Sequence, residues 1–260
     1  MADHRIRWQH LVSAPLPGAA NMAWDDALMA RARRTGHAVL RVYAWQSPTL
    51  SLGRNQAARD AYDTDAAARL GVEFVRRPTG GRALLHWHEV TYSVTAPDAF
   101  DATLRGAYDR INALLLHALR ELGVPAHLAA PAKRTIAPGL APCFDQPSAG
   151  EIVANGAKLV GSAQWRADGA LLQHGSILVE DDQPLIGQVL RRPQPAPPPA
   201  ATLARLVTPT PAFHDVAAKL VDALRVLSPD TAPLEPDAEL ERDVRAATAR
   251  YADPEWTWRR

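Results

Sequence analysis

Residues 151–180 read EIVANGAKLVGSAQWRADGALLQHGSILVE, and this stretch decides the fold class. It contains three β-rich runs, which are separated by the dipeptides Asn155-Gly156 and Asp168-Gly169. Both dipeptides tolerate the positive φ angles of the tight turns that join neighbouring antiparallel strands. The stretch therefore predicts three consecutive antiparallel strands.

Further strands are predicted upstream of this stretch. The runs 39–45 (VLRVYAW) and 49–53 (TLSLG) are separated by Gln46, Ser47 and Pro48, which predicts two paired strands joined by a short turn. The run 72–77 (VEFVRR) is rich in β-branched and aromatic residues and predicts one more strand.

Helices are predicted between these strands. Apolar residues recur with a period of 3.6 over 102–122, which predicts a helix that ends at Gly123. Shorter helices are predicted over 61–70 and over 22–34, the latter with Asn21 as its N-cap. This order lacks the strict βαβ alternation of a doubly wound fold. The predicted fold class is therefore α+β, with a mixed, mainly antiparallel β-sheet flanked by helices.

One segment has an unusual composition and divides the chain. In residues 191–211, RRPQPAPPPAATLARLVTPTP, seven of the twenty-one residues are proline, which favours extended backbone over helix or central strand. We therefore predict a main domain over 1–190, a proline-rich linker over 191–211 and a helical tail over 212–260. About fifty residues form a small core, so the tail is expected to dock on the main domain.

The overall composition excludes several classes of protein. The 29 Lys and Arg nearly balance the 28 Asp and Glu, so no global field draws the chain to nucleic acid or to an anionic membrane. No run approaches about 20 apolar residues, and the N-terminus lacks the apolar core of a signal peptide. A cytoplasmic protein with neither nucleic acid nor membrane among its partners is predicted.

The segment Arg76-Arg77-Pro78-Thr79-Gly80-Gly81-Arg82 is a candidate binding loop. Paired glycines let the backbone approach a ligand closely, and the flanking arginines offer donors to its oxygen atoms. The alternative interpretation is a surface hairpin with solvated arginines.

Two single residues are further candidates. Cys143 is the only cysteine and lies in a turn-rich loop over 129–148, so it is either a buried inert thiol or a nucleophile. Lys158 follows the tight turn at Asn155-Gly156 and either lies over a pocket or faces solvent. The histidines show no metal-ligand spacing, so no metal site is predicted.

Together these clusters resemble the catalytic domain shared by biotin and lipoate protein ligases and octanoyltransferases. The ending YADPEWTWRR (251–260) is also similar to that of the family. The closest resemblance is to the cysteine-dependent group that transfers octanoyl groups from acyl carrier protein to proteins. The motifs that carry it are RRPTGGRALLH (76–86), EVTYSV (89–94), CFDQPS (143–148), GAKLVGSAQ (156–164) and LLQHGSILVE (171–180).

The resemblance implies roles for individual residues. Cys143 would carry the acyl group as a thioester, and the positive charge of Lys158 would lower the pKa of its thiol. No cofactor is implied. The implied partners are octanoyl-acyl carrier protein as donor, and lipoyl domains or the glycine cleavage H protein as acceptor. The residues implied to bind the acyl group are Arg77, Gly80, Gly81, His86, Gly161, Ala163 and His174.

Two departures from the family pattern carry their own expectations. Trp87 follows His86 where the family usually has Asp, which predicts that His86 lacks a carboxylate partner. Ala149 and Gly150 replace an aromatic pair, which predicts less bulk near Cys143.

Arginine clusters offer a way to attract acidic partners. The sets Arg31, Arg33, Arg34 and Arg76, Arg77 are expected to steer acidic carrier proteins or lipoyl domains towards the chain.

Three other functions stay open from the sequence. The first is an ATP-dependent lipoate or octanoate protein ligase, which needs no cysteine. The second is an amidotransferase that moves octanoyl groups from the H protein to lipoyl domains. The third is a non-catalytic protein that binds lipoyl domains.

Overall fold

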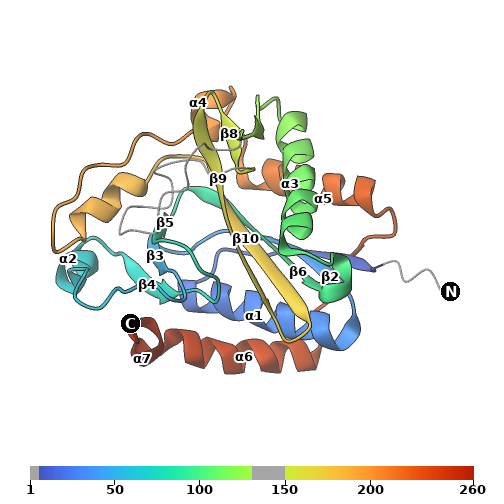
Figure 1. Cartoon of the computed structure of the whole chain (residues 1–260), viewed down its shortest axis with the longest axis horizontal. Helices are drawn as coiled ribbons and strands as arrows, with labels where there is room; N and C mark the ends of the chain where they lie inside the picture. The colour runs from blue at the N-terminus through green and yellow to red at the C-terminus, as the bar shows by residue number, and fades with distance from the viewer. Residues whose placement is uncertain (1–5, 131–149) are drawn as a thin grey trace.

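The computed structural model describes residues 6–130 and 150–260. Within these residues, one large mixed sheet crosses the molecule (Figure 1). β1 pairs in parallel with β2 and β11, and the remaining neighbours in this sheet are antiparallel. The predicted fold class is confirmed. The strands lie in the order β11 (Ala232–Pro233), β1 (Trp8–Val12), β2 (Ala38–Tyr43), β6 (Glu89–Pro97), β10 (Ala170–Leu178), β9 (Ala157–Ala167), β8 (Ile152–Ala154) and β7 (His127–Leu128).

A second, smaller sheet contains β4 (Glu73–Arg76), β3 (Thr49–Leu52) and β5 (Leu84–His86). The predicted pairing of 39–45 with 49–53 is wrong, because β2 belongs to the large sheet and β3 to the small one. The segment between them is anchored through Trp45, whose Nε1 donates to Thr91 Oγ1 at 2.8 Å. This contact holds the chain where it passes from the large sheet to the small one.

Helices cover both faces of the large sheet (Figure 1). Val39 packs in the core beneath α1 (Gly18–Thr35) and α6 (Ala238–Ala252). Its neighbour Leu40 packs in the core beneath α3 (Leu104–Glu121) and α5 (Phe213–Leu227), because successive strand residues face opposite sides. Within the described ranges, no helix has the length and apolar character needed to cross a membrane. The shorter elements are α2 (Thr64–Arg69), η1 (Asp98–Phe100), η2 (Gln183–Gln188), α4 (Leu203–Leu206) and α7 (Pro254–Thr257).

Local sequence patterns correctly predicted the two hairpins and the helix α3. Both residues of Asn155-Gly156 and of Asp168-Gly169 have positive φ angles, and the strands around them pair as predicted. The helix predicted over 102–122 is α3, and Gly123 just beyond it has a φ of 78°.

The predicted cap of the first helix is wrong. α1 begins at Gly18, so Asn21 lies inside it rather than before it. The Asn21 side chain is fully buried and donates to the carbonyl oxygens of Leu16 and Ala44. These carbonyl groups satisfy the buried amide of Asn21, so the side chain links the helix to neighbouring segments instead of capping it.

The proline-rich segment is extended over 193–202, but the expectation that it contains no helix is wrong for α4. Leu203 is fully buried, and the Ala201 N–H donates to the Lys158 carbonyl oxygen. After this segment, β11 pairs with β1 and α5 packs against α3. The division of the chain at residues 190 and 211 stays a prediction.

Candidate active site

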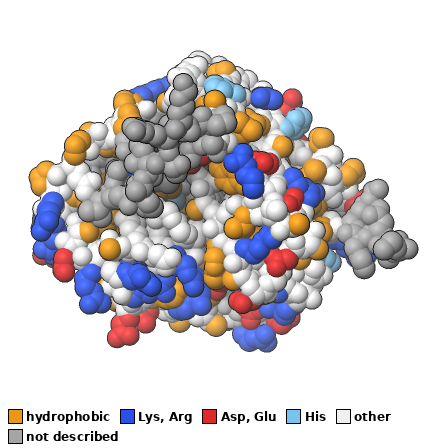
Figure 2. All heavy atoms as spheres, viewed as in Figure 1, with side chains coloured by type: hydrophobic (Ala, Val, Ile, Leu, Met, Phe, Trp, Pro, Cys, Tyr) orange, Lys and Arg blue, Asp and Glu red, His pale blue; other side chains and the backbone are white. Residues whose placement is uncertain are grey.

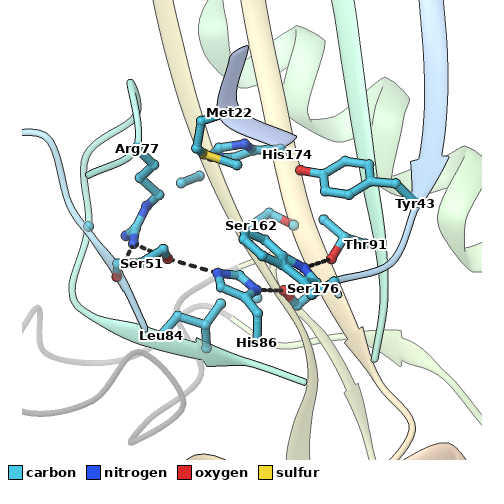
Figure 3. A pocket seen from close by; sticks show the side chains of 15 residues that line it. Met22, Tyr43, Ser51, Arg77, Leu84, His86, Thr91, Ser162, His174 and Ser176 are labelled. Atoms are coloured by element: carbon cyan, nitrogen blue, oxygen red, sulfur yellow. Dashed lines mark hydrogen bonds between the residues drawn. The ribbon is translucent and has the colours of Figure 1, made fainter. Parts of the chain in front are cut away.

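A cavity lies between the two sheets (Figure 3). It holds about 440 Å³ of empty space, including the open space at its mouth. Gly161 and Gly175 line its floor on β9 and β10, where a Cβ on Gly175 would lie 2.4 Å from the Gly161 carbonyl oxygen. The apolar side chains that line it are Met22, Tyr43, Trp45 and Leu84.

The structure brings six of the seven predicted acyl-binding residues to this cavity. Gly80 is the one that does not line it. Of the two predicted catalytic residues, Lys158 also lies outside the lining, and Cys143 lies outside the described residues. The six lining residues are Arg77, Gly81, His86, Gly161, Ala163 and His174.

Arg77 holds the glycine turn in place. Its side chain is buried, and its Nη2 donates to the carbonyl oxygens of Gly80 and Arg82 at 2.8 and 2.7 Å. Its Nη1 donates to Ser51 Oγ at 2.9 Å. Gly81 has a φ of 96°, and a Cβ there would lie 2.7 Å from Arg77 Nη2. The turn therefore needs glycine at 81 and a guanidinium beneath it.

Arg76 is also structural rather than solvated. It is fully buried and donates to the carbonyl oxygens of Gly53, Gln56 and Thr257. The interpretation of this segment as a surface hairpin with solvated arginines is wrong, and so is the expectation that Arg76 and Arg77 steer acidic partners. Main-chain carbonyl groups from distant segments hold both side chains inside the molecule.

His86 is fixed by a cluster of hydrogen bonds (Figure 3). Its Nδ1 lies 2.8 Å from Glu89 Oε1, and its Nε2 lies 2.8 Å from Ser51 Oγ. The ring stacks on Trp45 with centroids 4.0 Å apart. Glu89 Oε1 also accepts hydrogen bonds from Thr91 and Ser176. The expectation that His86 lacks a carboxylate partner is wrong, because the Glu89 carboxylate contacts its ring.

His174 belongs to a second cluster. Its Nδ1 lies 2.9 Å from Asp25 Oδ2, and its Nε2 lies 2.7 Å from Thr79 Oγ1. Asp25 is fully buried, and Arg41 Nη1 donates to its Oδ1 at 3.1 Å. The hydroxyl groups of Tyr43 and Ser93 donate to the same carboxylate.

The charges in this second cluster follow from its contacts. Burial raises the pKa of Asp25, but the hydrogen bond from His174 and the charge of Arg41 outweigh it and hold that pKa below its ordinary value. Burial lowers the pKa of His174, despite its bond to Asp25. The ring is therefore neutral, with Nδ1–H donating to Asp25 and Nε2 accepting from the Thr79 hydroxyl.

Lys158 lies at the base of the segment that contains Cys143. Its Nζ is buried and lies 2.8 Å from Glu151 Oε1. The Gly150 N–H donates to the Ala129 carbonyl oxygen at 3.1 Å, so the two described ends of that segment meet beside this pair. The alternative of a solvent-facing Lys158 is wrong.

With this geometry established, comparisons with known proteins place the chain in a family. The family model of the lipoyl protein ligase A/B catalytic domain matches residues 17–225. The chain belongs to this family. Octanoyltransferase LipM of Geobacillus kaustophilus is 34% identical over 97% of this chain and 98% of its own length. Octanoyltransferase LipM of Kyrpidia tusciae is 45% identical over 72% of this chain and 71% of its own.

Solved structures of lipoate protein ligases share the fold. A lipoate-protein ligase A bound with ATP superimposes with a TM-score of 0.79 and 22% identity, over 97% of this chain and 99% of its own. The bipartite lipoate protein ligase of Thermoplasma acidophilum was solved in a study that included its E2 lipoyl domain. It superimposes with a TM-score of 0.77 and 20% identity, over 98% of this chain and 97% of its own. At these identities the likeness shows the architecture.

The sequence motifs did not identify several residues that line the cavity or bond the residues of its wall. Glu89, Thr91 and Ser93 alternate along β6 with Val90, Tyr92 and Val94, so one face of the strand is polar and the other is in the core. The register places Ser93 opposite His174 and Thr91 opposite Ser176. This period-two pattern is visible in EVTYSV and could have identified Glu89.

Proposed function

We propose that this chain transfers an octanoyl group from acyl carrier protein to the target lysine of a lipoyl domain or the glycine cleavage H protein, as part of lipoate synthesis. Cys143 is the proposed acyl carrier within the enzyme. The observation that carries the proposal is the near full-length similarity to chains named octanoyltransferase. The cavity supports it, because its apolar walls suit an acyl chain.

The proposed reaction has two acyl transfers. In the first, the Cys143 thiolate forms a bond to the octanoyl carbonyl carbon, and the thiolate of the donor leaves. In the second, the neutral amine of the acceptor lysine attacks the enzyme thioester, Cys143 leaves as thiolate, and the new amide nitrogen loses a proton. The first transfer exchanges one thioester for another, and the second converts a thioester into a more stable amide, so neither transfer requires ATP.

Lys158 is the residue that we propose to activate Cys143. An ammonium group next to a cysteine favours the thiolate, which is the reactive form. The buried Lys158–Glu151 pair lies where the described ends of the segment containing Cys143 meet. The pairing with Glu151 also fixes the ammonium in one position.

The test is an intact-mass measurement of the protein after incubation with octanoyl-acyl carrier protein without ATP. We expect the wild type to gain one octanoyl group, which hydroxylamine removes and a lipoyl domain accepts. Cys143→Ala should gain none.

Each other outcome points to a different function. Acylation of the lipoyl domain only with free octanoate and ATP would identify a ligase. Loading from octanoyl-H protein but not from acyl carrier protein would identify an amidotransferase. Stable complexes with lipoyl domains without any acyl transfer would identify a binding protein.

A further inference from the structure

Four arginines form a cluster beside the C-terminal residues, which we call the rim cluster: Arg54, Arg59, Arg259 and Arg260. Figure 2 shows Lys and Arg side chains gathered in this region of the face, near the position of the C-terminus in Figure 1. Arg259 Nη2 donates to the Arg54 carbonyl oxygen at 3.0 Å. Arg59 donates to the Trp258 carbonyl oxygen, and its own N–H bonds the Arg260 carbonyl oxygen. Main-chain contacts therefore hold two distant segments together.

The side chains of the rim cluster have no side-chain carboxylate as an ion-pair partner in the described part of the chain. Within the described ranges, none of its four side chains forms a salt bridge with a carboxylate, although Asp60 and Glu255 are close in sequence. Burial lowers the pKa of Arg259, and the charges of Arg54 and Arg260 lower it further. Burial, Arg259 and Arg260 lower the pKa of the neighbouring Arg76 to about 10.

Two other arginines at the surface illustrate the paired state. Arg34 lies 3.2 Å from Glu239 and 2.9 Å from Asp243, and Arg250 lies 2.6 Å from Asp26. Arg31 is buried. The expectation that Arg31, Arg33 and Arg34 attract acidic partners therefore does not suit this surface. The rim cluster gathers four arginine side chains that form no ion pair within the described ranges, and like charges held together cost stability unless a partner supplies a counter-charge.

The rim cluster borders the cavity. The Arg54 N–H donates to the carbonyl oxygen of Thr79, the residue that bonds His174 in the cavity wall. The Arg54 guanidinium lies 4.4 Å from the ring centroid of Trp165, two residues beyond Ala163 on β9. A Cβ on Gly53 would lie 2.0 Å from the Gly81 carbonyl oxygen, so the loop that carries Arg54 touches the glycine turn.

We propose that the rim cluster docks an acidic surface of the carrier protein that delivers the acyl chain. This inference rests on the proposed function. Guanidinium groups bind carboxylates through two parallel hydrogen bonds, so clustered arginines suit a surface of Asp and Glu. The donor is the partner whose acyl chain must enter the cavity, so its surface must lie over the rim while the chain is transferred.

The test reverses two exposed charges of the cluster in the variant Arg59→Glu/Arg260→Glu. The matched control is Lys219→Glu/Arg225→Glu, which makes the same charge change on α5. Loading is measured from octanoyl-acyl carrier protein and from the small neutral thioester S-octanoyl-N-acetylcysteamine. The small donor reports on the cavity and the nucleophile without a docking surface.

We expect kcat/KM with the carrier protein to fall by about tenfold or more in the rim variant at low salt, because rim charges govern association. The difference from wild type should shrink at about 0.5 M salt, where exposed charges are screened. Loading from the small donor should stay at the wild-type level, and the control should match wild type with both donors. An equal fall with both donors, or no fall with either, would overturn the proposal.

A binding measurement separates this inference from the proposed function. If the wild type loads no acyl group from any donor, the proposed function fails, and binding of octanoyl-acyl carrier protein is followed by fluorescence anisotropy. Weaker binding in the rim variant alone would still support docking. Equal binding of octanoyl-acyl carrier protein by the wild type, the rim variant and the control would contradict docking. Weaker binding of the lipoyl domain alone, with binding of the carrier protein unchanged, would also contradict it.

Discussion

His86 and His174 both line the cavity and both contact a buried carboxylate, but the charges around the two carboxylates differ. Asp25, beside His174, forms a salt bridge with the fully buried Arg41. Within the described part of the chain, Glu89 has no Lys or Arg in ion-pair distance and contacts only His86 as a possible cation. The other oxygen of Glu89, Oε2, is buried and accepts no hydrogen bond there.

The comparison shows that buried polar clusters in one wall can serve different purposes. The Asp25 cluster is electrically complete without a ligand and without a charge on His174, so it supports the wall. The Glu89 cluster has an acceptor still open, and within the described residues no Lys or Arg lies in ion-pair distance of its carboxylate. His86 is therefore the histidine whose surroundings suit an interaction with a ligand.

The largest effect is expected from breaking the charge balance at Asp25. Arg41→Met leaves the buried carboxylate without its cation, and we expect the free energy of unfolding to fall by about 3–5 kcal/mol. Urea unfolding followed by circular dichroism measures this change.

A double variant makes the Arg41 test sharper. Arg41→Met/Asp25→Asn removes both charges and should regain part of the lost stability, because no uncompensated charge stays buried. A loss below about 1 kcal/mol in the single variant would show that Arg41 does not support the wall.

The Asp25–Arg41 pair also shows where sequence reasoning reaches its limit in the fold. The turns at Asn155-Gly156 and Asp168-Gly169 were predictable because a dipeptide determines them. Asn21 looked like a helix cap because its partners, Arg41 and the Ala44 carbonyl oxygen, lie 20 and 23 residues away. No local pattern carries that information.

The second prediction concerns Glu89, where a smaller effect is expected. Glu89→Gln keeps an oxygen that accepts from His86, Thr91 and Ser176 but removes the negative charge. We expect kcat for octanoyl transfer to fall by about 100-fold, because the cavity loses the negative charge that faces the His86 ring. The KM for the donor should stay near the wild-type value.

Stability distinguishes this role from a structural one. The free energy of unfolding of Glu89→Gln should change by less than about 1 kcal/mol, since the hydrogen bonds persist. A fall in stability as large as the fall in activity would place Glu89 among the wall supports beside Asp25.

The same contrast explains what could be predicted of the site. The segment 76–82 was identified from its paired glycines and flanking arginines, whereas His86, Gly161 and His174 were identified through the resemblance to the family. The burial of Arg76 was not, because its partners include the carbonyl oxygen of Thr257, 181 residues away. A buried arginine and a solvated one look alike in sequence.

The smallest effect is expected from the protonation of His174. Its pKa is lowered by burial in the folded state, whereas the unfolded ring binds a proton below its ordinary value of 6.5. The unfolded state therefore binds more protons in this range, so stability falls as pH drops below 6.5, by at most about 1.4 kcal/mol for each pH unit. The low pKa of Asp25 acts in the same direction only below its ordinary value of 3.8.

Between about pH 7.5 and pH 5, His174→Gln should reduce the slope of unfolding free energy against pH. His214→Gln, which changes an exposed histidine, should leave it unchanged. If His174→Gln kept the full slope, the neutral ring and the contrast with His86 would both be wrong.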